Sequence, residues 1–130
     1  MLQTQFDHER LDVYRLSIEY SAFAFGIASQ MPSSHKNLKE QWLRASQSIP
    51  LNIAEANGKS SLKSRCNFFD IARGSAFECS AIQDIFIACQ SQTTEELNPG
   101  KKLLIRIVSM LTKIARRGQN DSVPEHETVF

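Results

Sequence analysis

The chain has 130 residues, 42% of them apolar, which is enough for one hydrophobic core and too few for two ordinary domains. Its net charge of +1 is unevenly spread, because residues 1–117 carry all 15 Lys and Arg against 11 Asp and Glu. Residues 118–130 carry only acidic charges, Asp121, Glu125 and Glu127. We therefore expect one domain over residues 1–117, followed by an acidic tail, 118–130, too polar to order itself.

Cysteine usage and hydropathy argue against several protein classes. The three cysteines, Cys66, Cys79 and Cys89, are odd in number and lack Cys-x-x-Cys spacing, which fits neither a disulfide framework nor a zinc ribbon. The charged N-terminal residues do not fit a secretory signal. The longest apolar stretch, 18–31, contains Glu19 and is shorter than the roughly 20 residues that span a bilayer. We expect a soluble, cytoplasmic protein with reduced thiols.

Four helices are predicted. The first, from about residue 6 to 30, carries apolar side chains on two neighbouring faces, so we expect it to be contacted on two sides. One face holds Leu11, Tyr14, Ile18, Phe25 and Ala28, and the other holds Val13, Leu16, Tyr20, Phe23 and Ile27. The second helix follows Pro32, with Ser33 or Ser34 as its N-cap, and ends at Gly58 as a left-handed stop. Its seam is Leu38, Trp42, Ala45, Ile49, Asn52 and Ala56.

The third helix, capped by Ser60 or Ser61, has the longest seam. This seam is Phe68, Ala72, Ser75, Cys79, Ile82, Phe86 and Cys89, and beside it runs a stripe of Ile71, Gly74, Glu78, Ala81 and Ile85. Gly74 sacrifices about 1 kcal/mol of helix propensity. We therefore expect another helix, from this chain or a second copy, to approach closely there.

The fourth helix begins between residues 94 and 99 and ends near Arg117-Gly118. Thr93 and Glu96 have capping-box spacing, and Asn98-Pro99 is an alternative start. Its core residues are Leu104, Ile107, Val108, Leu111, Ile114 and Ala115. Short connections favour antiparallel neighbours, so the predicted fold is an all-α, up-down-up-down four-helix bundle.

Pro50 lies inside the second helix, where it leaves the Ser46 carbonyl without its usual donor at a cost of about 3 kcal/mol if nothing compensates. One interpretation is a tolerated kink. The other is a bend that turns polar side chains toward the third helix, forming a network that is either structural or ligand-binding. The residues expected in that network are Asn52, Glu55, Arg73, Ser75 and Glu78.

Two segments carry a family resemblance. They contain Arg44-Ala45, Ser48-Ile49-Pro50 and Asn52-Ile53-Ala54-Glu55, then Phe68, Ile71-Ala72, Gly74-Ser75-Ala76 and Glu78, and an N-terminal pattern of Phe6, Leu11, Val13 and Tyr14 accompanies them. This pattern, over about residues 6–116, resembles the four-helix-bundle proteins encoded in intervening sequences of bacterial 23S ribosomal RNA genes. Where that family usually has glycine after the Asn-Ile-Ala-Glu run, this chain has Ala56.

The resemblance implies more than a fold. Members commonly form rings of five subunits, so a homopentamer is expected. One related branch, the accessory variability determinant of diversity-generating retroelements, binds nucleic acid and a reverse transcriptase. Members of that branch are strongly basic, whereas this chain is nearly neutral.

A basic stripe on the fourth helix is the candidate contact for RNA or DNA: Lys102, Arg106, Lys113, Arg116 and Arg117. The alternative is a solvated face with cations near a helix C-terminus, where the dipole favours them. Lys36, Lys39 and Arg44 form a weaker second patch.

Residues suited to catalysis do not form a recognisable pattern. His8, His35 and His126 lie far apart, and Glu55 with Glu78 lacks the Glu-x-x-His motif of di-metal bundles. We expect no enzyme activity, cofactor or metal. The leading hypothesis is a self-associating interaction or scaffold protein, and the alternative is a nucleic-acid-binding accessory subunit acting with RNA or a reverse transcriptase.

Overall fold

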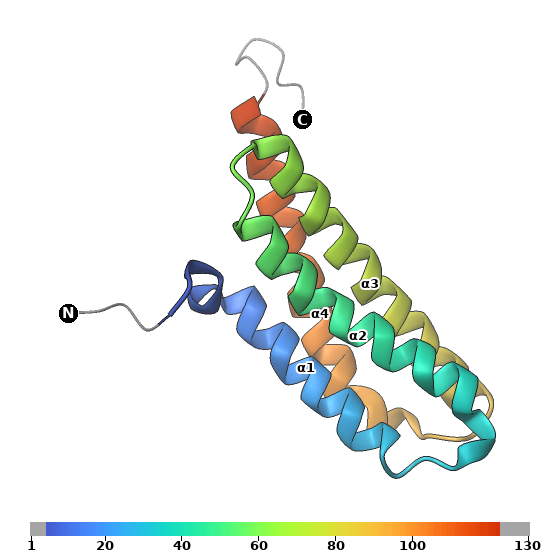
Figure 1. Ribbon diagram of the computed structural model, residues 1–130. Coiled ribbons are helices and arrows are strands. Elements are labelled where there is room, and N and C mark those ends of the chain that lie inside the picture. The colour runs from blue at the N-terminus through green and yellow to red at the C-terminus, as the bar shows by residue number, and fades with distance from the viewer. Residues whose placement is uncertain (1–4, 123–130) are drawn as a thin grey trace.

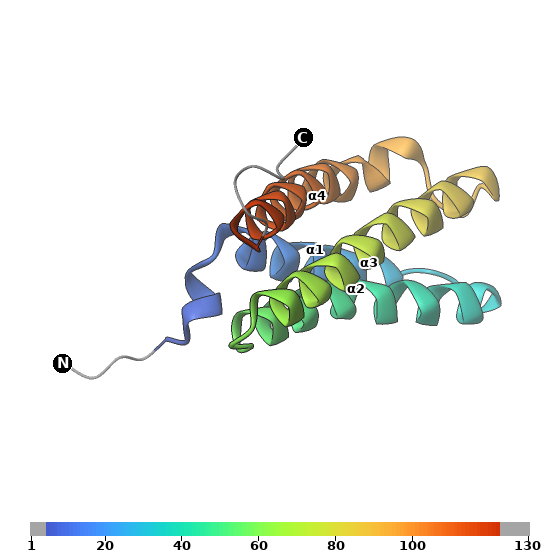
Figure 2. The ribbon, with the colours of Figure 1, turned by 90° about the horizontal axis from the view of Figure 1, so that it is seen from above.

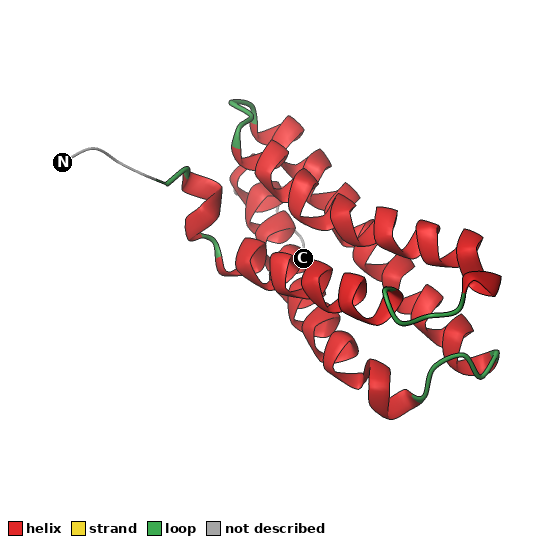
Figure 3. Cartoon of the chain, turned by 60° about the horizontal axis from the view of Figure 1, so that its bottom comes forward, coloured by secondary structure: helices red, strands yellow, loops and turns green. Residues whose placement is uncertain are grey.

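The computed structural model describes residues 5–122, with side chains as far as residue 116. The elements are a 3-10 helix η1 Asp7–Arg10, α1 Asp12–Ala28, a 3-10 helix η2 Ser33–His35, α2 Lys36–Asn57, α3 Leu62–Ala88 and α4 Thr94–Ser122. Over these residues there is no strand (Figure 3). The predicted all-α class and its four helices are confirmed. None of the described helices is long and apolar enough to cross a membrane.

Successive helices run in opposite directions, as their short connections require (Figure 1). Both α1 and α3 contact α2 and α4, so α1 and α3 occupy opposite corners of the bundle (Figure 2). The core between them is apolar, with Trp42 and Phe86 in edge-to-face contact at its centre. Its principal buried residues are Val13, Leu16, Tyr20, Ala24, Trp42, Ile49, Ile53, Phe69, Ala72, Cys79, Ile82, Phe86, Leu97, Leu104, Ile107 and Leu111.

A chain of buried hydrogen bonds joins all four helices. The indole Nε1 of Trp42 donates to the Tyr20 hydroxyl at 2.9 Å, and this hydroxyl donates to Gln83 Oε1 at 2.6 Å. Gln83 Nε2 in turn donates to the Leu97 carbonyl at 3.3 Å. Because a buried polar group without a partner costs about 1–3 kcal/mol, this chain fixes which side of each helix faces inward. Sequence analysis missed it, since a lone glutamine on α3 indicates nothing about its partners.

Helix one is the clearest correction to the predicted core. It begins at Asp12 instead of near residue 6, because residues 7–10 form η1. Of its two predicted faces, the one with Val13, Leu16 and Tyr20 is buried, whereas Ile18 and Phe25 of the other are each 45% exposed. On α3, Cys89 is exposed at the end of a seam that is otherwise largely buried.

The predicted side-chain caps form on α3 and α4 but not on α2, because Ser33 and Ser34 lie in η2 and the N-cap of α2 is His35, with no side-chain hydrogen bond. Ser61 caps α3 by accepting from the Ser64 amide, and Thr93 and Glu96 form the reciprocal capping box that starts α4. Gly58 was expected to be left-handed, but it has φ −85°. The left-handed position is Gln90 instead, with φ 61°. Helix α4 continues to Ser122, beyond the predicted end near Gly118, and residues 123–130 of the predicted tail lie outside the described part.

Within this chain the close helix approach occurs at Gly100 and not at Gly74, and approach to Gly74 by a second copy stays a prediction. A Cβ placed on Gly100 would collide with the Phe23 ring of α1 and come within 2.9 Å of Gln83 Oε1, whereas one on Gly74 meets nothing within 4 Å. Gly100 is therefore required for packing between α1 and α4. Gly74 is exposed on the outer side of α3 and contacts no other described helix.

We predict opposite effects of alanine at two helical glycines. Gly100→Ala should lower the free energy of unfolding by about 1–3 kcal/mol, because displacing Phe23 outweighs the gain of about 1 kcal/mol in helix propensity. The matched control is Gly26→Ala in α1, where a Cβ meets nothing within 4 Å, and it should be neutral or stabilising. Urea unfolding measures both changes. Equal effects at the two positions would contradict the assigned contact.

Candidate functional site

The carbonyl released by Pro50 has a donor on a neighbouring helix. Helix α2 runs through Pro50 without interruption, and the Ser21 hydroxyl of α1 donates to the Ser46 carbonyl at 3.0 Å. This is the carbonyl that the residue 50 amide would bond in an ordinary helix. This observation supports the first interpretation of Pro50: the proline is tolerated because α1 supplies the missing hydrogen bond.

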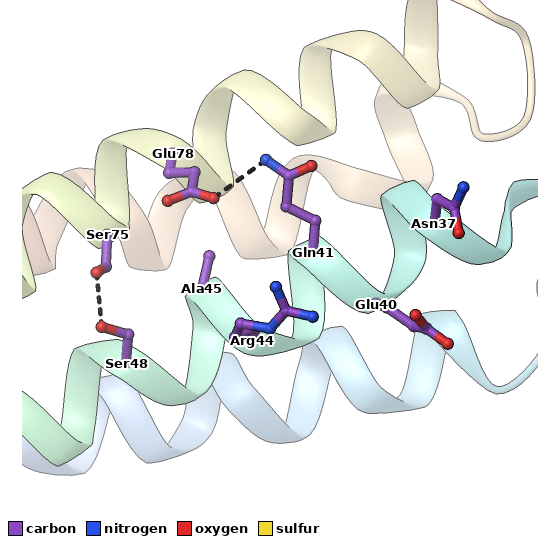
Figure 4. Close-up of a pocket in the computed structure, with 8 residues that line it drawn as sticks. All are labelled: Asn37, Glu40, Gln41, Arg44, Ala45, Ser48, Ser75 and Glu78. Atoms are coloured by element: carbon purple, nitrogen blue, oxygen red, sulfur yellow. Dashed lines mark hydrogen bonds between the residues drawn. The ribbon is translucent and has the colours of Figure 1, made fainter.

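The predicted polar network is centred on Ser48, a residue that was not assigned to it. Asn52 Nδ2 donates to the Ser48 carbonyl at 2.8 Å and to its hydroxyl at 2.9 Å. The Ser75 hydroxyl of α3 donates to the Ser48 hydroxyl at 2.8 Å (Figure 4). Asn52 and Ser75 thus lie in one network that ties α2 to α3. The spacing of Ser48 and Asn52, one helical turn apart, is the pattern that could have indicated the missing member.

The structure places the other three network residues in separate contacts. Glu55 pairs with Lys59 one turn later at 3.4 Å, on the surface. Arg73 turns toward α4, where its Nε donates to Thr112 Oγ1 at 2.9 Å. Glu78 accepts from Gln41 Nε2 at 3.3 Å on the exposed rim between α2 and α3 (Figure 4). The expected five-residue cluster therefore does not form within one subunit.

A polar groove of about 490 Å³ runs between α2 and α3 above the Ser48–Ser75 contact (Figure 4). It is lined by Asn37, Glu40, Gln41, Arg44, Ala45, Ser48, Ser75 and Glu78. Both family-like segments contribute to it, Arg44 and Ser48 from one and Ser75 and Glu78 from the other. Its rim carries hydrogen-bond donors and acceptors together with positively and negatively charged side chains. These groups suit polar contact with another molecule.

Cys79 is the buried thiol of the core, beside the Tyr20 hydroxyl. Burial raises the pKa of Cys79 to about 12 and lifts the pKa of Tyr20 well above its ordinary value, with Cys79 as a second cause for the tyrosine. Both groups are therefore neutral at physiological pH. A neutral buried thiol behaves as a small apolar side chain, so Cys79 contributes to packing.

Two stripes of small and apolar residues remain exposed on opposite corners of the bundle. The α1 stripe consists of Ile18, Ala22 and Phe25, and the α3 stripe of Ile71, Gly74, Glu78, Ala81 and Ile85. The large side chains in them are 43–45% exposed. Other large apolar side chains, Phe6, Leu51, Phe77 and Ile105, are exposed outside these two stripes.

The predicted basic stripe lies on the outer face of α4. Lys102, Arg106, Lys113 and Arg116 are all exposed, and none forms an ion pair with a described residue. Arg117 belongs to the same helix, but its side chain lies outside the described part. The four described cations thus present an uncompensated positive surface.

The Ser21 hydrogen bond predicts coupling between two substitutions. Ser21→Ala should cost about 1–2 kcal/mol of folding free energy, because it strands the Ser46 carbonyl. In a Pro50→Ala background the same change should cost less than about 0.5 kcal/mol, since the new amide at residue 50 bonds that carbonyl. Ser29→Ala serves as the control, because its hydroxyl bonds only the exposed Gly26 carbonyl of its own helix. Equal Ser21→Ala costs in both backgrounds would disprove the compensation.

Comparison with known proteins agrees with this architecture. A solved structure from Bacteroides thetaiotaomicron, described as a protein with unknown function from the S23 ribosomal protein family, superposes with a TM-score of 0.73 at 23% identity. The match covers 79% of this chain and 97% of that one, and shows a shared fold. Comparison with curated proteins gives no match. The model of the 23S rRNA-intervening sequence proteins matches residues 9–113, and the chain belongs to that family.

Proposed function

We propose that this protein is a non-enzymatic, cytoplasmic scaffold or interaction module that assembles with copies of itself into a ring of five. The observation that supports this is the pair of exposed α1 and α3 stripes. Contiguous exposed apolar surface marks an interaction site, because leaving it in water is unfavourable. Five copies is the number that the family resemblance suggests.

The position of the stripes favours a ring over a two-fold dimer. They lie on helices at opposite corners of the bundle and differ in composition, so one stripe does not complement itself. Contact between two different faces repeats from copy to copy, and it closes into a ring when the rotation between copies permits. A ring leaves the α4 surface available for other partners, whereas Glu78 belongs both to the α3 stripe and to the lining of the polar groove.

Light scattering coupled to size exclusion tests the assembly. We predict a mass near five times 14.7 kDa, with dissociation only on strong dilution. A mass of 14.7 kDa at every concentration would contradict self-association. A different stable multiple would retain self-association and refute the pentamer.

The α4 basic stripe favours a second function, nucleic-acid binding as an accessory subunit that works with RNA or a reverse transcriptase. Its four described cations are exposed and free of ion pairs to described residues, and ring symmetry would repeat the stripe around the particle. Phosphate contacts made by such cations dominate affinity for nucleic acid. The acidic charges elsewhere on the chain reduce the overall attraction, so this remains the second candidate.

Filter binding with single-stranded and structured RNA tests this second function. We predict salt-sensitive binding that Lys102→Glu with Arg106→Glu weakens by at least about ten-fold, because phosphate contacts are replaced by repulsion. The control with the same charge change is Arg10→Glu with Lys63→Glu, both exposed on other helices and outside both basic patches. Absence of binding at low salt, or equal loss in both variants, would remove the α4 stripe as a nucleic-acid site.

A further inference from the structure

The two exposed stripes match each other in spacing and in shape. Ile18 and Phe25 are large side chains seven residues apart on α1, and Gly74 and Ala81 are small residues seven residues apart on α3. Seven residues rise about 10 Å along either helix. The space above Gly74 is open, since nothing lies within 4 Å of a Cβ built there. Large side chains on one helix can therefore enter gaps of the same spacing on another, as in coiled-coil packing.

The direction of the helices makes this match a parallel one. Helices α1 and α3 run the same way in the bundle (Figure 1). In a ring whose copies all point in one direction, α1 of one copy therefore meets α3 of the next in parallel. If Ile18 is placed over Gly74, the equal spacing brings Phe25 over Ala81.

Charges at one end of the stripes agree with the same register. Arg15 lies three residues before Ile18, and Asp70 lies four residues before Gly74, both exposed. Within its own chain Arg15 pairs with Asp12 at 3.5 Å, with side chains 60% and 77% exposed, and its Nε donates to the exposed Glu9 carbonyl at 3.2 Å. Such a surface pair contributes little, whereas Asp70 has no ion pair among the described residues. The parallel register brings opposite charges, Arg15 and Asp70, together at the rim.

We propose that the α1 stripe of one copy docks into the α3 stripe of the next, with Ile18 over Gly74, Phe25 over Ala81 and Arg15 beside Asp70. This inference rests on the proposed self-association and specifies its contact.

Both stripes face partly toward α2, and this orientation favours closure of a ring. Ser21, next to the α1 stripe, donates to a carbonyl of α2, and Glu78 of the α3 stripe accepts from Gln41 of α2. Both stripes therefore tilt toward α2 and are not diametrically opposed. A contact between faces tilted in this way rotates each copy relative to the last, which closes a ring and does not extend a straight filament.

Filling the gaps of the α3 stripe tests the docking. Gly74→Leu and Ala81→Leu each add a side chain at an exposed helical position, so the fold of the subunit, followed by far-ultraviolet circular dichroism, should be retained. We expect the concentration at half-assembly, measured by sedimentation velocity, to rise about ten-fold or more. The matched control is Asn98→Leu at an exposed position of α4 away from both stripes, which should assemble like the unmodified protein.

Exchanging the two rim charges tests the register. Arg15→Asp and Asp70→Arg should each raise the concentration at half-assembly about ten-fold, because each places like charges opposite one another. The double variant should return it to within about two-fold of the unmodified protein. Single variants that assemble normally, or a double variant as weak as the singles, would overturn the Arg15–Asp70 contact.

The outcomes separate this inference from the proposed function. If the unmodified protein is a monomer at every concentration, both fail. If it assembles and the leucine variants assemble equally well, self-association stands and the docking of α1 into α3 is overturned. Weakened assembly of the leucine variants together with rescue by the charge exchange supports the proposed contact.

Discussion

The buried hydrogen-bond chain from Trp42 through Tyr20 and Gln83 to the Leu97 carbonyl sets the rotation of every helix in the bundle. A polar group enclosed in an apolar core is costly unless its partner is in place, and this chain has one member on each helix. Once Tyr20 and Gln83 must face inward, the opposite sides of α1 and α3 must face outward. The exposed stripes are therefore a consequence of satisfying the core.

The same logic explains how α2 accommodates a buried proline. Pro50 is buried and has no amide hydrogen, so the Ser21 hydroxyl donates to the Ser46 carbonyl in its place. This hydrogen bond links α1 to α2. Two residues before Pro50, Ser48 accepts hydrogen bonds from Asn52 and from Ser75, and so links α2 to α3. These polar contacts lie beneath the groove that holds Arg44 and Glu78. The family-like segments thus combine a structural core with a polar outer surface.

Helix identity and capping could be read from the sequence, because both depend on local chemistry. The Thr93–Glu96 capping box is an interaction between residues three positions apart, and it starts α4 where spacing predicts. The rotation of α1 about its own axis could not be predicted from the sequence, because α1 has two apolar faces. The hydrogen bond from Tyr20 to Gln83, which lies far away in the sequence, determines which face is buried. The need for Gly100 could not be predicted for the same reason, since it arises from Phe23 on another helix. Two of the five candidate network residues, Asn52 and Ser75, meet through Ser48, whereas Arg73 contacts Thr112 on α4.

The exposed α1 and α3 stripes are the observation behind the proposed recognition between copies. The most direct test is the rate of thiol labelling at Ala81→Cys, with Cys66 and Cys89 changed to serine and with Ser109→Cys as the exposed control. If a sister copy covers the α3 stripe, labelling at position 81 slows as protein concentration rises, while labelling at position 109 does not change. Equal and rapid labelling at both positions over the whole concentration range would contradict this account.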